Sequence, residues 1–121
     1  SAPYVAGARE FLDQFHTRIP LYVASGTPDD ELREILNRRS MQHYFVSAHG
    51  SPAEKSVILE NIVRTRNFDR HRVLMVGDAA SDLEGARKAG TAFIGRHSAG
   101  GEIFPSDVTT IADLHALADL L

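Results

Sequence analysis

Short apolar runs alternate with helix-like segments along this chain, and the alternation limits the folds that it can adopt. The runs contain no charged residue and lie at residues 19–24, 44–47, 73–77 and 91–95. Around them, apolar residues recur at the spacing of amphipathic helices. These helices are predicted over residues 6–16, from Thr27 onward, and over 55–66, 79–89 and 108–121. Helices alternating with continuous apolar strands predict an α/β fold, a three-layer α/β/α sandwich around a parallel sheet.

Several local signals set the expected boundaries of the helices. Thr27 is predicted to be the N-cap of the second helix, with Pro28 at its first helical position. Gly90 is predicted to end the fourth helix in the left-handed conformation that glycine tolerates. Ile111 is in register with Leu114 and is therefore assigned to the last helix.

The composition indicates one soluble domain and excludes several classes of function. The chain has 121 residues and a net charge of −3, so one domain over residues 1–121 is expected, without the basic field that attracts nucleic acid or membranes. It contains no cysteine, which excludes disulfides and thiolate chemistry and favours a reducing, cytoplasmic location. Neither a nucleic acid nor a membrane is therefore expected as a partner.

In open parallel sheets, ligands bind beyond the carboxyl ends of the strands, so the polar residues that follow each run are informative. Ser25 and Gly26 follow the first run and precede a helix. A hydroxyl, an unobstructed backbone and a helix N-terminus can together bind a phosphate. The alternative interpretation is a helix cap with a turn glycine. Lys55 begins the third predicted helix. The N-terminus of a helix is the positive end of its dipole and disfavours a cation, so a lysine at this position indicates a functional role. The alternative is an exposed lysine beside Glu54.

Two acids follow the third run. Asp78 comes directly after Gly77, and Asp82 lies one helical turn further on. Separately, they could be an N-cap and a first-turn acid. Together they offer the hard oxygen ligands that Mg²⁺ prefers, with Gly77 keeping the backbone clear of the metal. A hydroxyl, a lysine and metal-binding acids at three successive strand ends are the components that phosphoryl transfer requires, except for a nucleophile.

These residues resemble three of the four motifs of the haloacid dehalogenase-like hydrolases, in the family's order. LYVASGTP is similar to motif two, which implies that Ser25 and the Gly26 amide bind the substrate phosphate. Lys55 resembles the lysine of motif three, which acts in catalysis by holding the charge of the phosphate and the nucleophile. VLMVGDAASDLEGARKAG resembles motif four. It implies that Asp78 is a direct Mg²⁺ ligand, and that Asp82 supports the metal through water or Lys55.

The sequence departs from the family at motif one, a strand that ends in DxDx(T/V) and supplies the nucleophilic aspartate. No Asp-x-Asp occurs here. The chain is therefore interpreted as the C-terminal part of such a hydrolase, with motif one and the cap upstream. The resemblance implies that the absent strand is central, between the runs at 19–24 and 73–77. Without it, these runs would expose unpaired edges that favour self-association, and the chain alone would be inactive.

The resemblance implies that the intact protein is a Mg²⁺-dependent phosphatase acting on a small phosphate monoester through a phospho-aspartate. The alternative is a degenerate, non-catalytic module that binds phosphate or another protein. A receiver domain is disfavoured because Ser25, Lys55 and Asp78 occur in the wrong order for it. A dinucleotide-binding domain is disfavoured because SGTPDD lacks the GxGxxG pattern.

Overall fold

The computed structural model describes residues 7–97 and 104–121. Residue 6 of the first predicted helix and residues 98–103 of the last predicted loop lie outside these ranges. The helices are α1 (Ala8–Phe15), α2 (Asp29–Arg38), α3 (Lys55–Thr65), α4 (Ala80–Ala89) and α5 (Leu114–Leu120). The strands are β1 (Tyr22–Pro28), β2 (Ser47–Ser51), β3 (Leu74–Gly77), β4 (Ala92–Arg96) and β5 (Thr110–Ile111). The predicted alternation is confirmed, with β5 as an additional strand.

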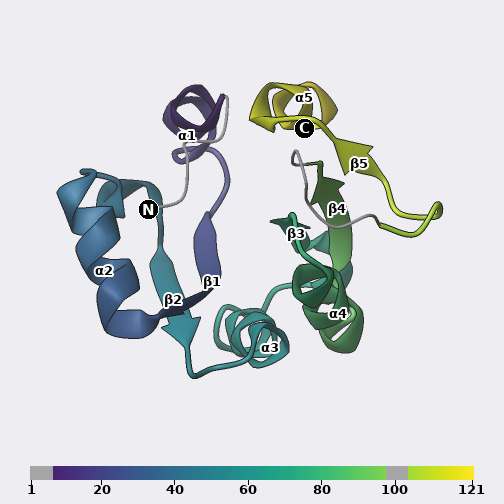
Figure 1. Cartoon of the computed structure of the whole chain (residues 1–121), viewed down its shortest axis with the longest axis horizontal. Helices are drawn as coiled ribbons and strands as arrows, with labels where there is room; N and C mark the ends of the chain where they lie inside the picture. The colour runs from purple at the N-terminus through teal and green to yellow at the C-terminus, as the bar shows by residue number, and fades with distance from the viewer. Residues whose placement is uncertain (1–6, 98–103) are drawn as a thin grey trace.

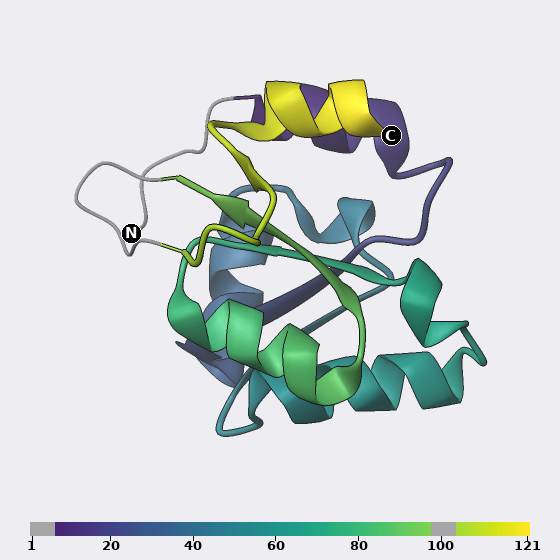
Figure 2. The same cartoon turned by 90° about the vertical axis from the view of Figure 1, so that its right-hand side faces the viewer.

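All strand pairs in the described residues are parallel, but they form two separate sheets. β1 pairs with β2, and β3, β4 and β5 pair in that order. Within the described residues β1 and β3 are not paired with each other, so each has one edge without a neighbouring strand. Helices α1 and α5 lie on one side of the strands, and α3 and α4 lie on the opposite side (Figures 1 and 2). The α/β layered fold with parallel strands is confirmed, and the strands of the described residues form two sheets.

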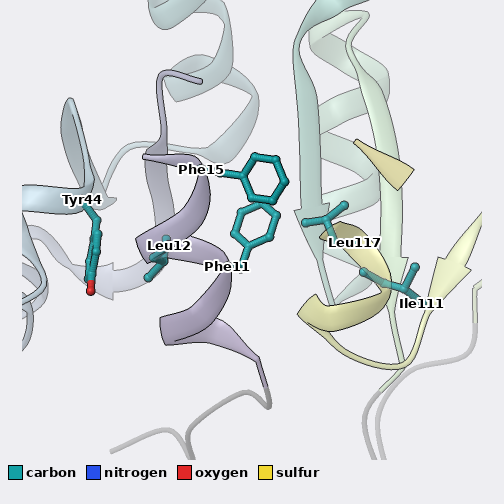
Figure 3. Packing of buried hydrophobic residues seen from close by; sticks show 6 residues of the cluster. All are labelled: Phe11, Leu12, Phe15, Tyr44, Ile111 and Leu117. Carbon is teal, nitrogen blue, oxygen red and sulfur yellow. The ribbon is translucent and has the colours of Figure 1, made fainter. Parts of the chain in front are cut away.

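An apolar cluster connects the two sheets on the side of α1 and α5. The rings of Phe11 and Phe15 stack with their centroids 4.8 Å apart, and Figure 3 shows them between Leu12 and Leu117. Tyr44 and Ile111 complete the buried cluster. Partly buried residues from the side of β1 and from the β3–β4–β5 sheet pack against it. They include Leu21, which directly precedes β1, and Leu74, Val76 and Ile94. Side-chain packing therefore holds the β1–β2 sheet and the β3–β4–β5 sheet together, and in the described part of the chain no strand pairing joins them.

A second, smaller cluster lies under α3 and α4. Its buried members are Leu59, Met75, Ala86 and Ala89. Ala24 of β1 packs against it, as do Val73, directly before β3, and Phe93 of β4. Apolar clusters therefore extend to β3 on both faces, from Leu21 directly before β1 on one face and from Ala24 of β1 on the other.

Several predicted boundaries were wrong. The first strand is Tyr22–Pro28 and not residues 19–24. The second strand is Ser47–Ser51 and not residues 44–47, because Gln42–Tyr44 form a 3-10 helix. The ring of Tyr44 packs into the first apolar cluster, and its hydroxyl donates a hydrogen bond to Asp13. Ile111 belongs to β5 and not to the last helix, which starts three residues later, after the N-cap Asp113. Gly90 ends α4 with a φ of 75°, as predicted.

Thr27 is not an N-cap, because β1 continues through it to Pro28 and α2 begins at Asp29. The side chain of Asp29 makes the polar connection at this junction. Its Oδ1 accepts a hydrogen bond of 3.0 Å from the backbone N–H of Gly50, which ties the start of α2 to β2. That hydrogen bond, together with Arg33, lowers the pKa of Asp29 below its usual value of 3.8.

Candidate functional site

Ser25 and Gly26 lie inside β1, near its carboxyl end. The Ser25 hydroxyl accepts a hydrogen bond of 3.1 Å from the N–H of Thr27, so the serine stabilises the part of β1 where the register with β2 is irregular. Gly26 is exposed, and a Cβ at this position would meet no atom within 4 Å. Packing therefore does not require a glycine here. The helix N-terminus expected directly after these residues begins later, at Asp29.

Lys55 is the first residue of α3, and its ammonium group contacts α4. Nζ donates to Oδ1 of Asp82 at 2.5 Å and to the hydroxyl of Ser81 at 3.3 Å. Both partners of the ion pair are mostly covered, with side-chain exposures of 19% for Lys55 and 7% for Asp82. The carboxylate offsets the unfavourable position of a cation at a helix N-terminus. The structure therefore brings together two predicted site residues that are far apart in the sequence.

The carboxylate of Asp82 is held on two sides. Oδ1 accepts from Lys55, and Oδ2 accepts a hydrogen bond of 3.1 Å from the N–H of Ala79 at the start of α4. A Cβ on Gly77 would overlap this carboxylate. The close approach of Asp82 is therefore a physical reason for a glycine at position 77. The predicted role of Gly77 in leaving space for a metal stays a prediction.

Asp78 follows β3, and its side chain is 48% exposed. Its Oδ2 accepts a hydrogen bond of 2.9 Å from Nη2 of Arg96, the last residue of β4. This pairing follows from the register of the two strands, in which Gly77 lies opposite Gly95. The sequence analysis did not identify Arg96. Asp78 was identified as the first polar residue after an apolar run. The same rule would have identified Arg96, which directly follows the fourth run.

A pocket of about 360 Å³ brings Ser25, Gly26 and Lys55 together. Ser81 and Lys88 of α4 also line it, and neither was predicted as a site residue. Its complete lining is Ser25, Gly26, Ala53, Glu54, Lys55, Ser56, Ser81, Glu84, Gly85 and Lys88. The three predicted phosphate-binding residues therefore share one surface, whereas Asp78 is not part of the lining. The lining has three serine hydroxyls and two ammonium groups that can bind an anion, and the carboxylates of Glu54 and Glu84 balance the charge of the two lysines.

The predicted metal ligands do not form a complete cation site by themselves. Within the described ranges, no group of three or more histidine or acidic side chains could hold a metal ion. The donor chemistry nevertheless suits Mg²⁺, which proteins often bind through one or two carboxylates, with substrate phosphates and water as further ligands. The half-exposed carboxylate of Asp78 fits that arrangement. Asp82 has both of its oxygens engaged by Lys55 and Ala79.

The layered parallel fold, with polar side chains gathered at its strand ends, defines a Rossmannoid α/β protein. The sequence matches the profile of the family described as haloacid dehalogenase-like hydrolase over residues 2–96. The chain belongs to this family, as its motifs predicted. A comparison with curated proteins gives no match.

Solved structures of haloacid dehalogenase-like proteins share the fold. A hydrolase of this family from Streptococcus pneumoniae is 19% identical, with a TM-score of 0.81, and the match covers 96% of this chain and 59% of that one. A protein described as a predicted phosphatase, from Clostridium acetobutylicum, is 19% identical, with a TM-score of 0.83 and coverages of 95% and 58%. A subfamily IA hydrolase from Geobacter sulfurreducens is 21% identical, with a TM-score of 0.83 and coverages of 97% and 55%.

The chain therefore spans less than two thirds of the length of each of these proteins. In the described part of the chain, no helix combines the length and apolar character needed to cross a membrane.

Proposed function

We propose that this chain is the phosphate- and metal-binding part of a Mg²⁺-dependent phosphatase that hydrolyses a small phosphate monoester through a phospho-aspartate. The main support is the pocket that joins Ser25, Gly26 and Lys55, next to the Lys55–Asp82 ion pair. Membership in a hydrolase family is consistent with this chemistry.

Lys55 can bind a phosphate without losing its contacts to α4. An ammonium group has three donors, and Nζ uses one for Asp82 and one for Ser81. The third donor is available for a phosphate oxygen at the pocket. The hydroxyl of Ser25 can donate its own proton while it accepts from Thr27, and the exposed backbone of Gly26 allows close approach. Preorganised donors of this kind stabilise the charge that develops on a transferring phosphoryl group.

We propose that the nucleophilic aspartate is supplied by an extended segment that fills the sheet between β1 and β3. Two observations support this. Each of these strands has one unpaired edge within the described residues, and apolar clusters extend to β3 from β1, or from the residue directly before it, on both faces. A strand inserted parallel to them would end at the same edge of the sheet as Ser25 and Asp78. A second copy of the chain could use the same edges, and this is the alternative occupant.

The proposed chemistry needs an acid at the end of that segment. Its carboxylate oxygen attacks phosphorus while the bond to the substrate alcohol breaks, and water then releases phosphate from the acyl phosphate. Asp78 would hold the Mg²⁺, which when bound neutralises charge on the phosphate. Lys55, oriented by Asp82, neutralises charge on the phosphate from the side of α3.

The test is hydrolysis of p-nitrophenyl phosphate with Mg²⁺ by the intact protein, meaning this chain together with its natural upstream segment. Asp78→Asn should lower kcat by at least about a hundredfold, because the charged ligand is lost. Asp107→Asn is the matched control, since this acid is 75% exposed and pairs only weakly with Arg87 at 3.6 Å. The 121-residue chain alone should show no turnover.

Near-normal activity of Asp78→Asn would refute the metal assignment. Activity of the 121-residue chain alone would show that the nucleophile has been misplaced. If the intact protein binds inorganic phosphate but does not turn over substrate, the non-catalytic phosphate-binding module is the correct alternative.

A further inference from the structure

The ion pair between Arg96 and Asp78 occupies the carboxylate that the proposed function assigns to Mg²⁺. Nη2 of Arg96 lies 2.9 Å from Oδ2 of Asp78. The arginine side chain is only 21% exposed, although it ends a strand. Within the described residues, its other hydrogen bond is a long one of 3.4 Å, from Nη1 to the carbonyl of His97. The acid is therefore the main polar partner of Arg96.

A cation that binds Oδ2 of Asp78 must displace this guanidinium, and a cation that binds Oδ1 lies close to its positive charge. An arginine stays protonated at any pH at which the protein is folded, so it cannot release the carboxylate by losing a proton. A divalent cation has twice the charge and a smaller radius, and it can replace the guanidinium at the carboxylate oxygen. The replacement costs the free energy of the ion pair. The cation affinity of the site is therefore lower than the affinity that Asp78 would have without Arg96.

We propose that Arg96 is a resident counter-ion of Asp78 that the divalent cation displaces, so that the arginine sets the cation affinity of the site. The inference rests on the proposed function, in which Asp78 is a metal ligand. Strand register supports it, because the pairing of Gly77 with Gly95 puts the following residues of β3 and β4 side by side. Arg96 therefore neutralises the exposed acid whenever the cation is absent.

The opposite role makes the opposite prediction. If Arg96 served to orient Asp78 for the metal, removing the arginine would weaken cation binding. If Arg96 is a competitor, removing it strengthens cation binding. A partly exposed ion pair corresponds to a change of about two- to fivefold in affinity. The sign of the change therefore separates the two roles.

The experiment titrates the full protein with Mn²⁺ alone, which takes the same oxygen ligands as Mg²⁺, and follows binding by electron paramagnetic resonance. We expect Arg96→Gln to bind Mn²⁺ about two- to fivefold more tightly than the wild type. Arg96→Lys keeps the positive charge but lacks the planar guanidinium group, and its Mn²⁺ affinity should lie between those of the wild type and Arg96→Gln. Arg87→Gln, which removes a weak surface pair of α4, should leave the affinity unchanged. Circular dichroism would establish that each variant is folded.

A double substitution tests whether the effect acts through Asp78. Asp78→Asn should weaken Mn²⁺ binding, and adding Arg96→Gln to it should produce no further change. Equal or weaker Mn²⁺ binding by Arg96→Gln alone would overturn the counter-ion role and leave the metal site intact. An Asp78→Asn variant with wild-type affinity would instead refute the metal site of the proposed function. The two failures are therefore distinguishable.

Discussion

Replacing Gly77 by alanine tests the core of the site most directly. The added methyl group would overlap the carboxyl group of Asp82, which is buried and cannot swing into solvent. To make room, Asp82 must give up or distort its hydrogen bonds to Lys55 or Ala79. A single methyl group at the end of β3 should therefore disturb the connection between α3 and α4.

The size of the effect follows from these contacts. Overpacking a filled interior costs about 1–3 kcal/mol. A lost hydrogen bond to a charged group costs about 1.5–3 kcal/mol, and the reduced freedom of the unfolded chain returns about 0.4–1 kcal/mol. We therefore expect Gly77→Ala to lower the free energy of unfolding by about 2–5 kcal/mol.

Urea denaturation followed by circular dichroism would measure the effect. With a slope of about 2 kcal/mol per molar urea, the midpoint should fall by roughly 1–2.5 M. Gly26→Ala is the matched control, because a methyl group there meets no atom within 4 Å. It should leave the midpoint unchanged or raise it slightly. If both variants unfold at the same urea concentration, the close approach of Asp82 does not explain the glycine.

Two further substitutions test the packing and the acid sensitivity of the fold. Phe15→Ala removes one ring of the stacked pair in the larger apolar cluster and should cost about 3–5 kcal/mol in a thermal melt. Val57→Ala, at a side chain that is 48% exposed, should change stability by less than about 0.5 kcal/mol. Equal losses would contradict the assigned core. Asp29→Asn should destabilise the protein near pH 6, because the Gly50 N–H lowers the pKa of the folded-state carboxylate. That contribution is complete above the unfolded pKa of about 3.9 and disappears as the pH falls through the lower folded-state pKa. A difference between wild type and variant that does not depend on pH would refute this account.

Much of the candidate site could be predicted because strand ends leave a local signal. Asp78 directly follows a continuous apolar run, and Ser25 is near the end of another. In a parallel sheet such positions lie along one edge, whatever the exact strand boundaries are. Lys55 was identified because a cation at a helix N-terminus is unfavourable. The structure shows that the carboxylate of Asp82 offsets this cost.

Contacts between distant segments could not be predicted in the same way. Arg96 meets Asp78 only because β3 and β4 pair in a register that no local pattern specifies. The role of Gly77 depends on where the Asp82 carboxylate lies after α4 has packed. The two-residue strand β5 is too short to show a period, so the helical spacing of Ile111 was misleading.

Periodicity and order along the chain are enough to specify the class of fold and the polar residues near the strand ends. Which of these residues meet depends on the packed structure. It paired Lys55 with Asp82 and Arg96 with Asp78, and within the described residues it did not pair β1 with β3. Pairings of this kind depend on packing between segments far apart in the sequence, and that packing exists only in the folded chain.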